Sequence, residues 1–320
     1  MTTEISVGPL RVVAVGCPQD AMAPPASIDE AGRVAWYTGA EVIVDGAATL
    51  RRPGVHELDL SAGRLLIRTG SGIHLYAESS EPVDIAVAGG RSPLGDVYAA
   101  FHDITLHDGD IAFTATLEDG RRTLVIRDRQ VLTTGAAVGG GRLGGFLVSR
   151  LGFSVCVIAM IDNRPEVLHA QADLVAWSDT GLGVPLWQAP AISAETSIAA
   201  VTLAGGQGAL VATAMGVGAA VIAEGDFGTP VASSAGNPFG VACTRDGELW
   251  LGVFRDRLPL EGACIAPLAV GDRTDTGEVV TAFRPLKFGP DGTLLLAALL
   301  DGGTPALLTL HDLFGWFPST

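Results

Sequence analysis

A short unit of apolar strands and glycine turns recurs along this chain of 320 residues. In the clearest copies, which begin at Ala26 and His102, an apolar strand and a Gly-centred tight turn are followed by further short strands. The first-turn glycines are Gly32, Gly63, Gly109, Gly152, Gly206, Gly247 and Gly292. Four-stranded units of roughly 40 to 50 residues are typical of β-propellers. The spacing therefore predicts an all-β fold, a seven-bladed β-propeller.

The two ends of the chain complement each other in this prediction. The last unit supplies three strands, whereas the segment Leu10 to Gly16 is an orphan strand that precedes the first unit. If this N-terminal strand pairs with the last unit, every unit has four strands and no sheet edge is left open. We therefore expect the N-terminal strand to close the last blade. The alternative is an open solenoid, in which this strand stays unpaired.

We expect one propeller domain over residues 1–320. Its blades are predicted at about 26–54, 55–90, 98–138, 145–181, 197–236, 238–285 and 286–313, with 10–16 added to the last. In the third unit the strands are predicted at His102–Leu106, Ile111–Leu117, Thr123–Arg127 and Gln130–Thr134, separated by Asp-Gly turns in which glycine takes a positive φ. Residues 178–195 are predicted to form one of the longest loops.

Charge and apolar patterning exclude several classes of protein. The chain carries 35 acidic and 20 basic residues, a net charge of −15, which argues against a nucleic-acid partner because binding to phosphates requires clustered Lys and Arg. No apolar run reaches the length of about 18 residues that a membrane helix needs. The start of the chain has no export signal and its four cysteines are scattered, so we predict a cytoplasmic, acidic protein without disulfides.

One motif carries a resemblance to a known group of proteins. The string Asp29-Glu30-Ala31-Gly32-Arg33-Val34-Ala35-Trp36 resembles the N-x-x-G-x-x-A-F repeat of bacterial tandem-repeat propeller proteins, and residues 106–113 match its Gly, Ala and Phe positions. The other units keep the glycine and the apolar strand alone. The resemblance implies the propeller fold and a bacterial origin. Members of that group are mostly exported or surface-anchored and of unknown activity, whereas this chain lacks an export signal.

Functional residues of a propeller are expected where the innermost strands meet the central channel. His56 and His102 fall seven residues before their marker glycines, each followed by a carboxylate, Glu57 or Asp103. Imidazole is suited to acid–base chemistry near neutral pH, and a neighbouring carboxylate can orient it, so the two histidines are the candidate catalytic residues. The alternative is that both histidines satisfy backbone groups at a blade edge.

The candidate ligand-binding residues are Glu57, Asp103, Trp187, Asn237 and Arg284. Trp187 falls in the predicted loop and would form an apolar wall, whereas Arg284 and Asn237 would hold the charge and the oxygen of an anionic or carbonyl-bearing ligand. We expect no cofactor, and no second histidine pair at ligand spacing supports a metal.

Three function classes stay open. In the first, the channel mouth binds a small organic molecule and carries out acid–base chemistry of the lyase, hydrolase or isomerase type. In the second, the ring is a non-catalytic platform for another protein. In the third, it is a structural component of a bacterial assembly. The histidine pair favours the first class, because a catalytic pocket needs converging polar groups.

Overall fold

The structure is a computed structural model. It describes residues 10–16, 24–77, 81–107, 110–138, 141–151, 154–162, 164–170, 175–179, 186–192, 196–202, 206–214, 218–232, 239–255, 258–289, 292–311 and 313. In a number of strands, mainly between residues 145 and 267, the backbone alone is described.

The described strands form seven antiparallel sheets. The first contains β2 (Ala26–Ile28), β3 (Val34–Tyr37), β4 (Glu41–Val44) and β5 (Ala47–Arg51). The second contains β6 (Val55–Ser61), β7 (Arg64–Thr69), β8 (Gly72–Ala77) and β9 (Val83–Val87). The third contains β10 (Tyr98–His107), β11 (Asp110–Leu117), β12 (Arg122–Ile126) and β13 (Arg129–Thr133).

The fourth sheet has five strands: β14 (Ala137–Val138), β15 (Gly141–Leu151), β16 (Ser154–Ile161), β17 (Arg164–Ala170) and β18 (Val175–Asp179). The fifth contains β19 (Leu186–Ile192), β20 (Thr196–Thr202), β21 (Gly208–Ala214) and β22 (Gly218–Glu224). The sixth contains β23 (Val231–Ala232), β24 (Phe239–Arg245), β25 (Glu248–Arg255) and β26 (Leu258–Ala269). The seventh contains β27 (Val280–Phe288), β28 (Leu294–Leu300), β29 (Thr304–Leu310) and β1 (Arg11–Val15), with a 3₁₀ turn at Asp301–Gly303.

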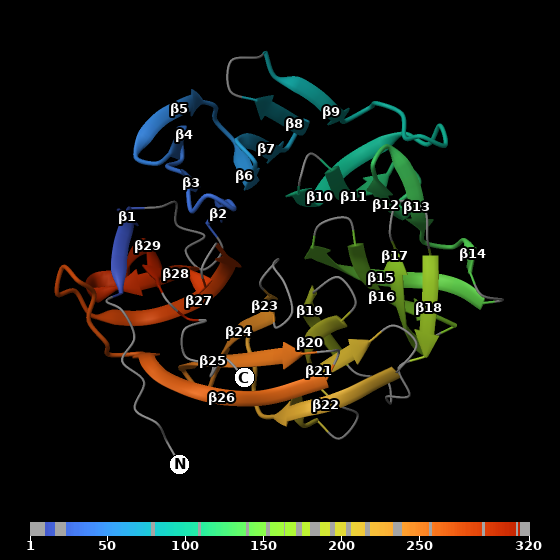
Figure 1. The fold of residues 1–320 in the computed structure, drawn as a ribbon. Helices are drawn as coiled ribbons and strands as arrows, with labels where there is room; N and C mark the ends of the chain where they lie inside the picture. The colour runs from blue at the N-terminus through green and yellow to red at the C-terminus, as the bar shows by residue number, and fades with distance from the viewer. Residues whose placement is uncertain are drawn as a thin grey trace.

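The sheets are arranged around a common centre, like the blades of a fan (Figure 1). The strands nearest the centre are β2, β6, β10, β15, β19, β23 and β27 (Figure 1). Each of them contacts the next in chain order, and β27 contacts β2. The described part of the chain is thus all-β, as the sequence predicts.

Two sequence predictions agree closely with the observed strands. In the third sheet, all four predicted strands are found with boundaries within a few residues, and the Asp-Gly turn between β11 and β12 has Gly120 at φ 82°. The N-terminal strand β1 pairs antiparallel with β29, from Arg11 opposite Thr309 to Val15 opposite Ala306. The sheet that contains the last strands of the chain is therefore completed by its first described strand.

The fifth and sixth sheets begin earlier than predicted. Leu186–Ile192 is strand β19 and not a loop, and the two-residue strand β23 precedes β24. Gly206 and Gly247 consequently lie in the second turn of their sheets and not in the first. The sequence prediction was wrong here because every turn of such a sheet suits glycine, so a glycine period does not identify which turn comes first.

Apolar side chains pack between neighbouring sheets. Between the second and third sheets, Leu66 and Ile73 lie in one buried cluster with Ile104 and Phe113. Similar clusters join the first sheet to the second and the sixth to the seventh. Because successive side chains of a strand point to opposite faces, each sheet contributes to the cores on both of its sides.

A buried polar cluster joins the first, second, third and seventh sheets near the centre. Lys287 of β27 donates from Nζ to Asp59 Oδ1 at 2.6 Å, Ser27 Oγ at 2.9 Å and the Leu60 carbonyl at 3.2 Å. Asp59 also accepts from Ser27 Oγ and from the Leu106 backbone N–H, both at 2.8 Å. We call Lys287, Asp59 and Ser27 the polar clasp. Burial alone would raise the pKa of Asp59, but Lys287 and these hydrogen bonds lower it.

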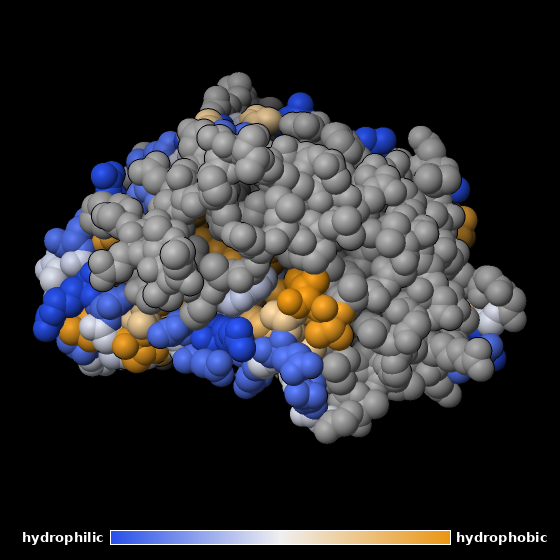
Figure 2. Space-filling view, turned by 60° about the horizontal axis from the view of Figure 1, so that its bottom comes forward, coloured by the Kyte–Doolittle hydropathy of each residue, from blue (hydrophilic) through white to orange (hydrophobic). Residues whose placement is uncertain are grey.

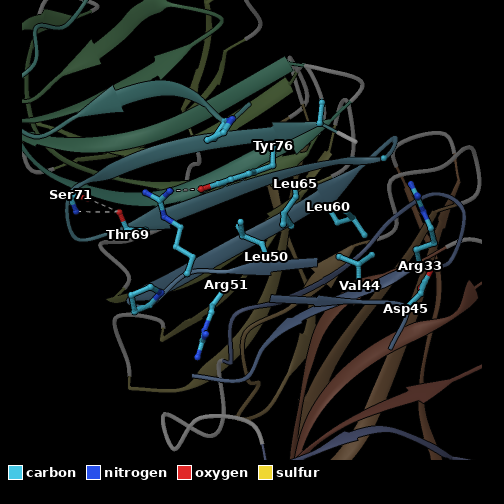
Figure 3. Close-up of a pocket in the computed structure, with 15 residues that line it drawn as sticks. Arg33, Val44, Asp45, Leu50, Arg51, Leu60, Leu65, Thr69, Ser71 and Tyr76 are labelled. Carbon is cyan, nitrogen blue, oxygen red and sulfur yellow. Dashed lines mark hydrogen bonds between the residues drawn. The ribbon is translucent and has the colours of Figure 1, made fainter. Parts of the chain in front are cut away.

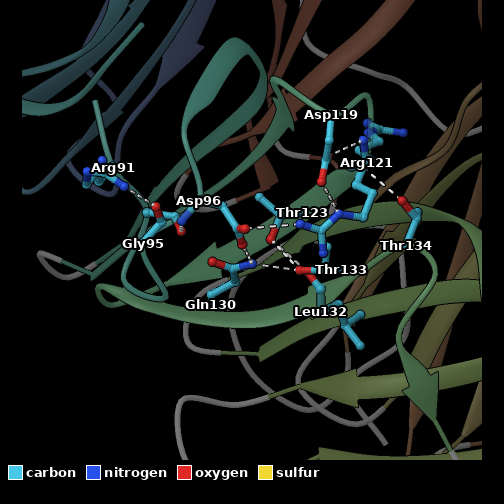
Figure 4. Close-up of polar contacts among 12 residues, drawn as sticks. Arg91, Gly95, Asp96, Asp119, Arg121, Thr123, Gln130, Leu132, Thr133 and Thr134 are labelled. Carbon is cyan, nitrogen blue, oxygen red and sulfur yellow. Dashed lines mark hydrogen bonds and ion pairs between the residues drawn. The ribbon is translucent and has the colours of Figure 1, made fainter. Parts of the chain in front are cut away.

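Two connecting segments between sheets share one pattern, Gly-x-Arg-Ser/Thr-x-x-Gly-Asp/Glu-Val. They are residues 89–97 and 271–279, and in each the arginine donates to the carbonyl of the second glycine, at 2.8 Å for Arg91 and 2.7 Å for Arg273. In the first segment, Asp96 binds Arg121 at 3.0 Å and Gln130 at 3.1 Å (Figure 4). These contacts hold the segment against the third sheet.

The described surface mixes hydrophilic and hydrophobic side chains. Figure 2 shows small hydrophobic areas beside larger hydrophilic ones. The large apolar side chains that are exposed include Val15, Val83, Leu94 and Val270, on edge strands or connecting segments. In the part of the chain that the structure describes, no helix is long and apolar enough to cross a membrane.

Candidate functional site

The two candidate catalytic histidines both lie on innermost strands, but not at equivalent positions. His56 is the bulged residue of β6, between Val55 and Glu57, and its side chain is exposed. In β10 the bulge falls one residue later, at Asp103, so that His102 is paired with Thr114. Counted from the hairpin, His102 therefore takes the pairing position that Glu57 takes in the neighbouring sheet. A β-bulge inserts one residue into a strand and shifts the pairing of the residues before it. The equal spacing of the two histidines from their glycines therefore did not give them equivalent positions in the two sheets.

His102 is half-buried on the third sheet. Its Nε2 lies 2.9 Å from the Thr116 hydroxyl oxygen. Burial and then the charge of Arg122 lower the pKa of His102, against a smaller opposing effect of Asp103. The imidazole is therefore neutral at neutral pH.

The carboxylates beside the histidines take part in contacts within and between sheets. Glu57 Oε2 lies 3.0 Å from Arg68 Nε and accepts from the Ile104 backbone N–H at 3.3 Å, which links β6 to β10. Asp103 accepts from Arg122 at 2.9 Å and from the Thr114 hydroxyl at 3.0 Å. Both carboxylates thus hold strands in place.

Of the three other candidates, Arg284 is the one whose side chain the structure describes. Arg284 lies in the middle of β27 with a half-buried side chain, and burial lowers the pKa of its guanidinium. Trp187 belongs to β19, of which the backbone is described, and Asn237 lies outside the described residues. Among the residues with described side chains, no three His, Cys, Asp or Glu groups are placed to hold a metal ion.

A groove between the first and second sheets is a candidate binding site that the sequence did not predict. Its volume is about 960 Å³. The apolar part of its lining includes Val44, Leu50, Leu60 and Leu65, which belong to the core cluster between the two sheets or pack against it. Figure 3 shows Leu50, Leu60 and Leu65 in the middle, Arg33 and Asp45 at one end, and Thr69 and Ser71 at the other. The side chain of Arg51 points away from Thr69 and Ser71 (Figure 3).

Three arginines line this groove: Arg33, Arg51 and Arg52. Arg33 makes an ion pair with Asp29 at 2.7 Å, whereas the side chain of Arg51 is 86% exposed and its Nε lies 3.9 Å from the Glu41 carboxylate. Arg52 is held by Tyr76 and His74. The signal in the sequence was the Arg51-Arg52 pair, a local concentration of positive charge in a chain with 20 basic and 35 acidic residues.

Comparison with known proteins identifies the architecture. No protein-family model matches the chain, and no curated protein matches it. Among solved structures, a chain of the mitotic checkpoint complex is similar at 13% identity and a TM-score of 0.54, over 96% of this chain and 93% of that one. The AfRom2 CNH domain is similar at 10% identity and a TM-score of 0.51, over 94% and 98%.

A chain from the complex of S. cerevisiae dbp5 with nup159 and gle1 is similar at 10% identity and a TM-score of 0.51, over 97% of each chain. At sequence identities this low, the similarity is evidence for the fold alone. Together with the radial antiparallel sheets, they show that the protein is a β-propeller.

Proposed function

We propose that this β-propeller is a non-catalytic platform for a protein partner, and that the groove between its first two sheets is the docking site. The observation that carries the proposal is the groove itself, which combines an apolar floor with three arginines in its lining. Central apolar anchors surrounded by polar groups are typical of surfaces that bind proteins.

The ring is proposed to be closed and seven-bladed. Three observations support this: the innermost strands contact one another in turn with β27 against β2, β1 completes the seventh sheet, and the polar clasp joins the seventh sheet to the first and second. A closed ring has no unpaired edge at its junction and is therefore a rigid support for a docking site.

The proposed occupant is an extended protein segment that carries apolar and acidic side chains. A volume of about 960 Å³ lies at the upper end of the range for small-molecule pockets, about 300 to 1,000 Å³. The shape and the charge favour a peptide, because the apolar floor lies between two polar ends. The groove lining contains three arginines and one carboxylate, Asp45, whereas the whole chain has a net charge of −15. This local excess of positive charge favours an acidic segment.

The contacts of the candidate catalytic residues support the non-catalytic function. Glu57 and Asp103 are bound to arginines and to groups of β10 and β11, and His56 is set off from His102 by the shifted bulge. These interactions stabilise the sheets.

The test is a selection of short peptides from a random display library on the purified protein. Selected peptides are expected to contain apolar and acidic residues, and to lose at least tenfold in affinity on Leu50→Asp, which puts a charge on the groove floor. A second groove variant, Pro82→Trp at an exposed position of the lining, should block binding without touching the core.

Leu94→Asp is the matched control, because Leu94 is 73% exposed and lies outside the groove lining. Melting curves of all three variants check the fold. Peptides that bind both folded groove variants as tightly as the wild type would refute this docking site.

A further inference from the structure

We propose that the docked segment binds as an added β-strand on the free edge of β5, with apolar and acidic side chains in alternation. This inference rests on the proposed docking function and specifies how the segment binds. In the part of the chain that the structure describes, β4 is the one strand paired with β5, which lies at the outer rim of the ring (Figure 1). Extended peptides bind such edges through main-chain hydrogen bonds.

The backbone at the end of β5 indicates which groups face this edge. The Arg52 N–H donates to the Ala40 carbonyl at 3.1 Å, next to the pair that Arg51 forms with Glu41 of β4. In an antiparallel ladder, residue pairs that exchange hydrogen bonds alternate with pairs that do not. Arg51 is therefore in a pair of the second kind. Its N–H and C=O point away from β4 and face an added strand.

The two faces of β5 differ in character. Successive side chains of a strand point to opposite faces, as Leu50 and Arg51 do (Figure 3). Leu50 lines the groove and packs against the core cluster, whereas the Arg51 side chain is 86% exposed. A strand added beside β5 has the same alternation. One set of its side chains therefore enters the groove beside Leu50, and the other set lies beside Arg51.

The face that carries Arg51 favours an acidic side chain in the second set. Arg51 lies opposite Glu41, and the distance of 3.9 Å from its Nε to that carboxylate is too long for a hydrogen bond. Because exposed pairs of this kind contribute little free energy, the guanidinium is available to a second carboxylate. An acidic residue directly opposite Arg51 on the added strand forms a cross-strand ion pair.

The seventh sheet already contains an outer strand that is not continuous with its neighbours. β1 pairs with β29 from the other end of the chain, and the Gly16 N–H donates to the Pro305 carbonyl at 2.8 Å, next to the pair Val15–Ala306. This is the pattern of the Arg52 bond to Ala40. The outer edge of a sheet in this ring thus accepts a separate segment by main-chain pairing.

The first test measures the main chain of the ligand. One peptide from the display selection is synthesised with a single N-methyl group on each backbone nitrogen in turn, which removes the N–H and blocks close approach of a strand. Alternate N–H groups of an added strand face β5, so binding should weaken about tenfold at every second residue and by less than about threefold between them. Losses without a period of two would overturn strand addition.

The second test changes the edge itself. Arg51→Pro removes the N–H that faces the added strand, and proline is tolerated at such positions of edge strands, so binding should weaken about tenfold in a folded protein. Arg51→Gln keeps this N–H. It should reduce only the preference for glutamate over glutamine at the residue opposite Arg51, by about two- to fivefold, because cross-strand ion pairs are weak.

Val87→Pro is the matched control for the proline. Val87 pairs with Gly72 at the end of the outer strand β9, and the Ala88 N–H donates to the Ser71 carbonyl at 3.0 Å, so the position is equivalent to that of Arg51. Val87 lies outside the groove lining, and its replacement should leave binding unchanged. Melting curves check the fold of both proline variants, and the N-methyl scan decides if Arg51→Pro does not fold.

Equal binding to the wild type and to folded Arg51→Pro would overturn the added strand. If Leu50→Asp still abolishes binding in that case, the strand addition fails and the docking function stands. If Leu50→Asp and Pro82→Trp have no effect, the docking function fails. Self-association of the protein that Arg51→Pro removes would assign this edge to a second copy of the chain, which would also overturn the proposal.

Discussion

Replacing Lys287 by methionine removes the positive charge of the polar clasp but keeps most of the apolar length of the side chain. In the wild type, Nζ donates to Asp59, Ser27 and the Leu60 carbonyl. After the substitution Asp59 keeps its hydrogen bonds from Ser27 and from the Leu106 N–H. Its carboxylate, whose side chain is 11% exposed, is left without a cation.

The magnitude follows from burial. Removing one partner of a fully buried ion pair costs about 3–5 kcal/mol. The side chain of Lys287 is 33% exposed, so water replaces part of the lost interaction, and we expect a loss of about 2–3 kcal/mol in the free energy of unfolding. With an unfolding entropy of about 2.1 cal/mol/K per residue over 320 residues, this lowers the melting temperature by about 3–4 °C.

The pH dependence of the stability tests whether the charge of Asp59 causes this loss. The pKa of Asp59 is lower in the folded than in the unfolded chain, so its stabilisation is present above the unfolded pKa of about 3.9 and is lost as the pH falls through the folded pKa. Without Lys287 the folded pKa rises, and stability begins to fall at a higher pH. The difference in melting temperature between wild type and variant should be largest near pH 7 and should decrease in acid.

The assay is thermal unfolding followed by circular dichroism across this pH range. Arg64→Met, at an exposed position of β7, is the matched control and should change the unfolding free energy by less than about 0.5 kcal/mol. The reasoning is refuted if the melting temperature of Lys287→Met equals that of the wild type near pH 7. It is also refuted if the gap is the same in acid, because the charge of Asp59 would then not be its cause.

Three further predictions concern the sheets. Gly72→Ala should lower the unfolding free energy by about 1–3 kcal/mol in denaturant titrations, because a Cβ at Gly72 would lie 2.5 Å from the backbone carbonyl oxygen of Ala86; an unchanged midpoint would contradict this contact. Deleting residues 1–17 removes β1 and exposes the edge of β29, so light scattering should detect aggregation, and a monomer with the wild-type melting temperature would count against ring closure. Cys243 is a fully buried thiol, so mass spectrometry after labelling should find it modified in denaturant alone, and labelling of the native protein would contradict its burial.

The sequence located most strands because their signals are local. The third sheet was predicted strand by strand from alternating apolar runs and Asp-Gly turns, and the pairing of β1 followed from counting strands at the two ends. The inner strands of the fifth and sixth sheets were missed. Leu186–Ile192 contains a proline that obscures the strand pattern, and Val231–Ala232 is too short to show any period.

The candidate site was less predictable, because it depends on contacts between distant residues. The sequence predicted His56 and His102 at equivalent places where innermost strands begin, but a bulge at a different residue in each strand gives the two histidines different pairing positions. The groove is formed by two sheets, and Arg52 is held there by Tyr76 and His74 of β8, contacts that the sequence does not show.

The sequence by itself determined that this chain forms short antiparallel strands joined by tight turns, repeated often enough to make a β-propeller. The reason is that turn chemistry and apolar alternation act over a few residues. The tertiary structure decided which strand lies innermost in each sheet, how Lys287 meets Asp59 and where the groove lies. These features arise from pairs that are far apart in the chain, 228 residues for Lys287 and Asp59, and no local pattern encodes such a pairing.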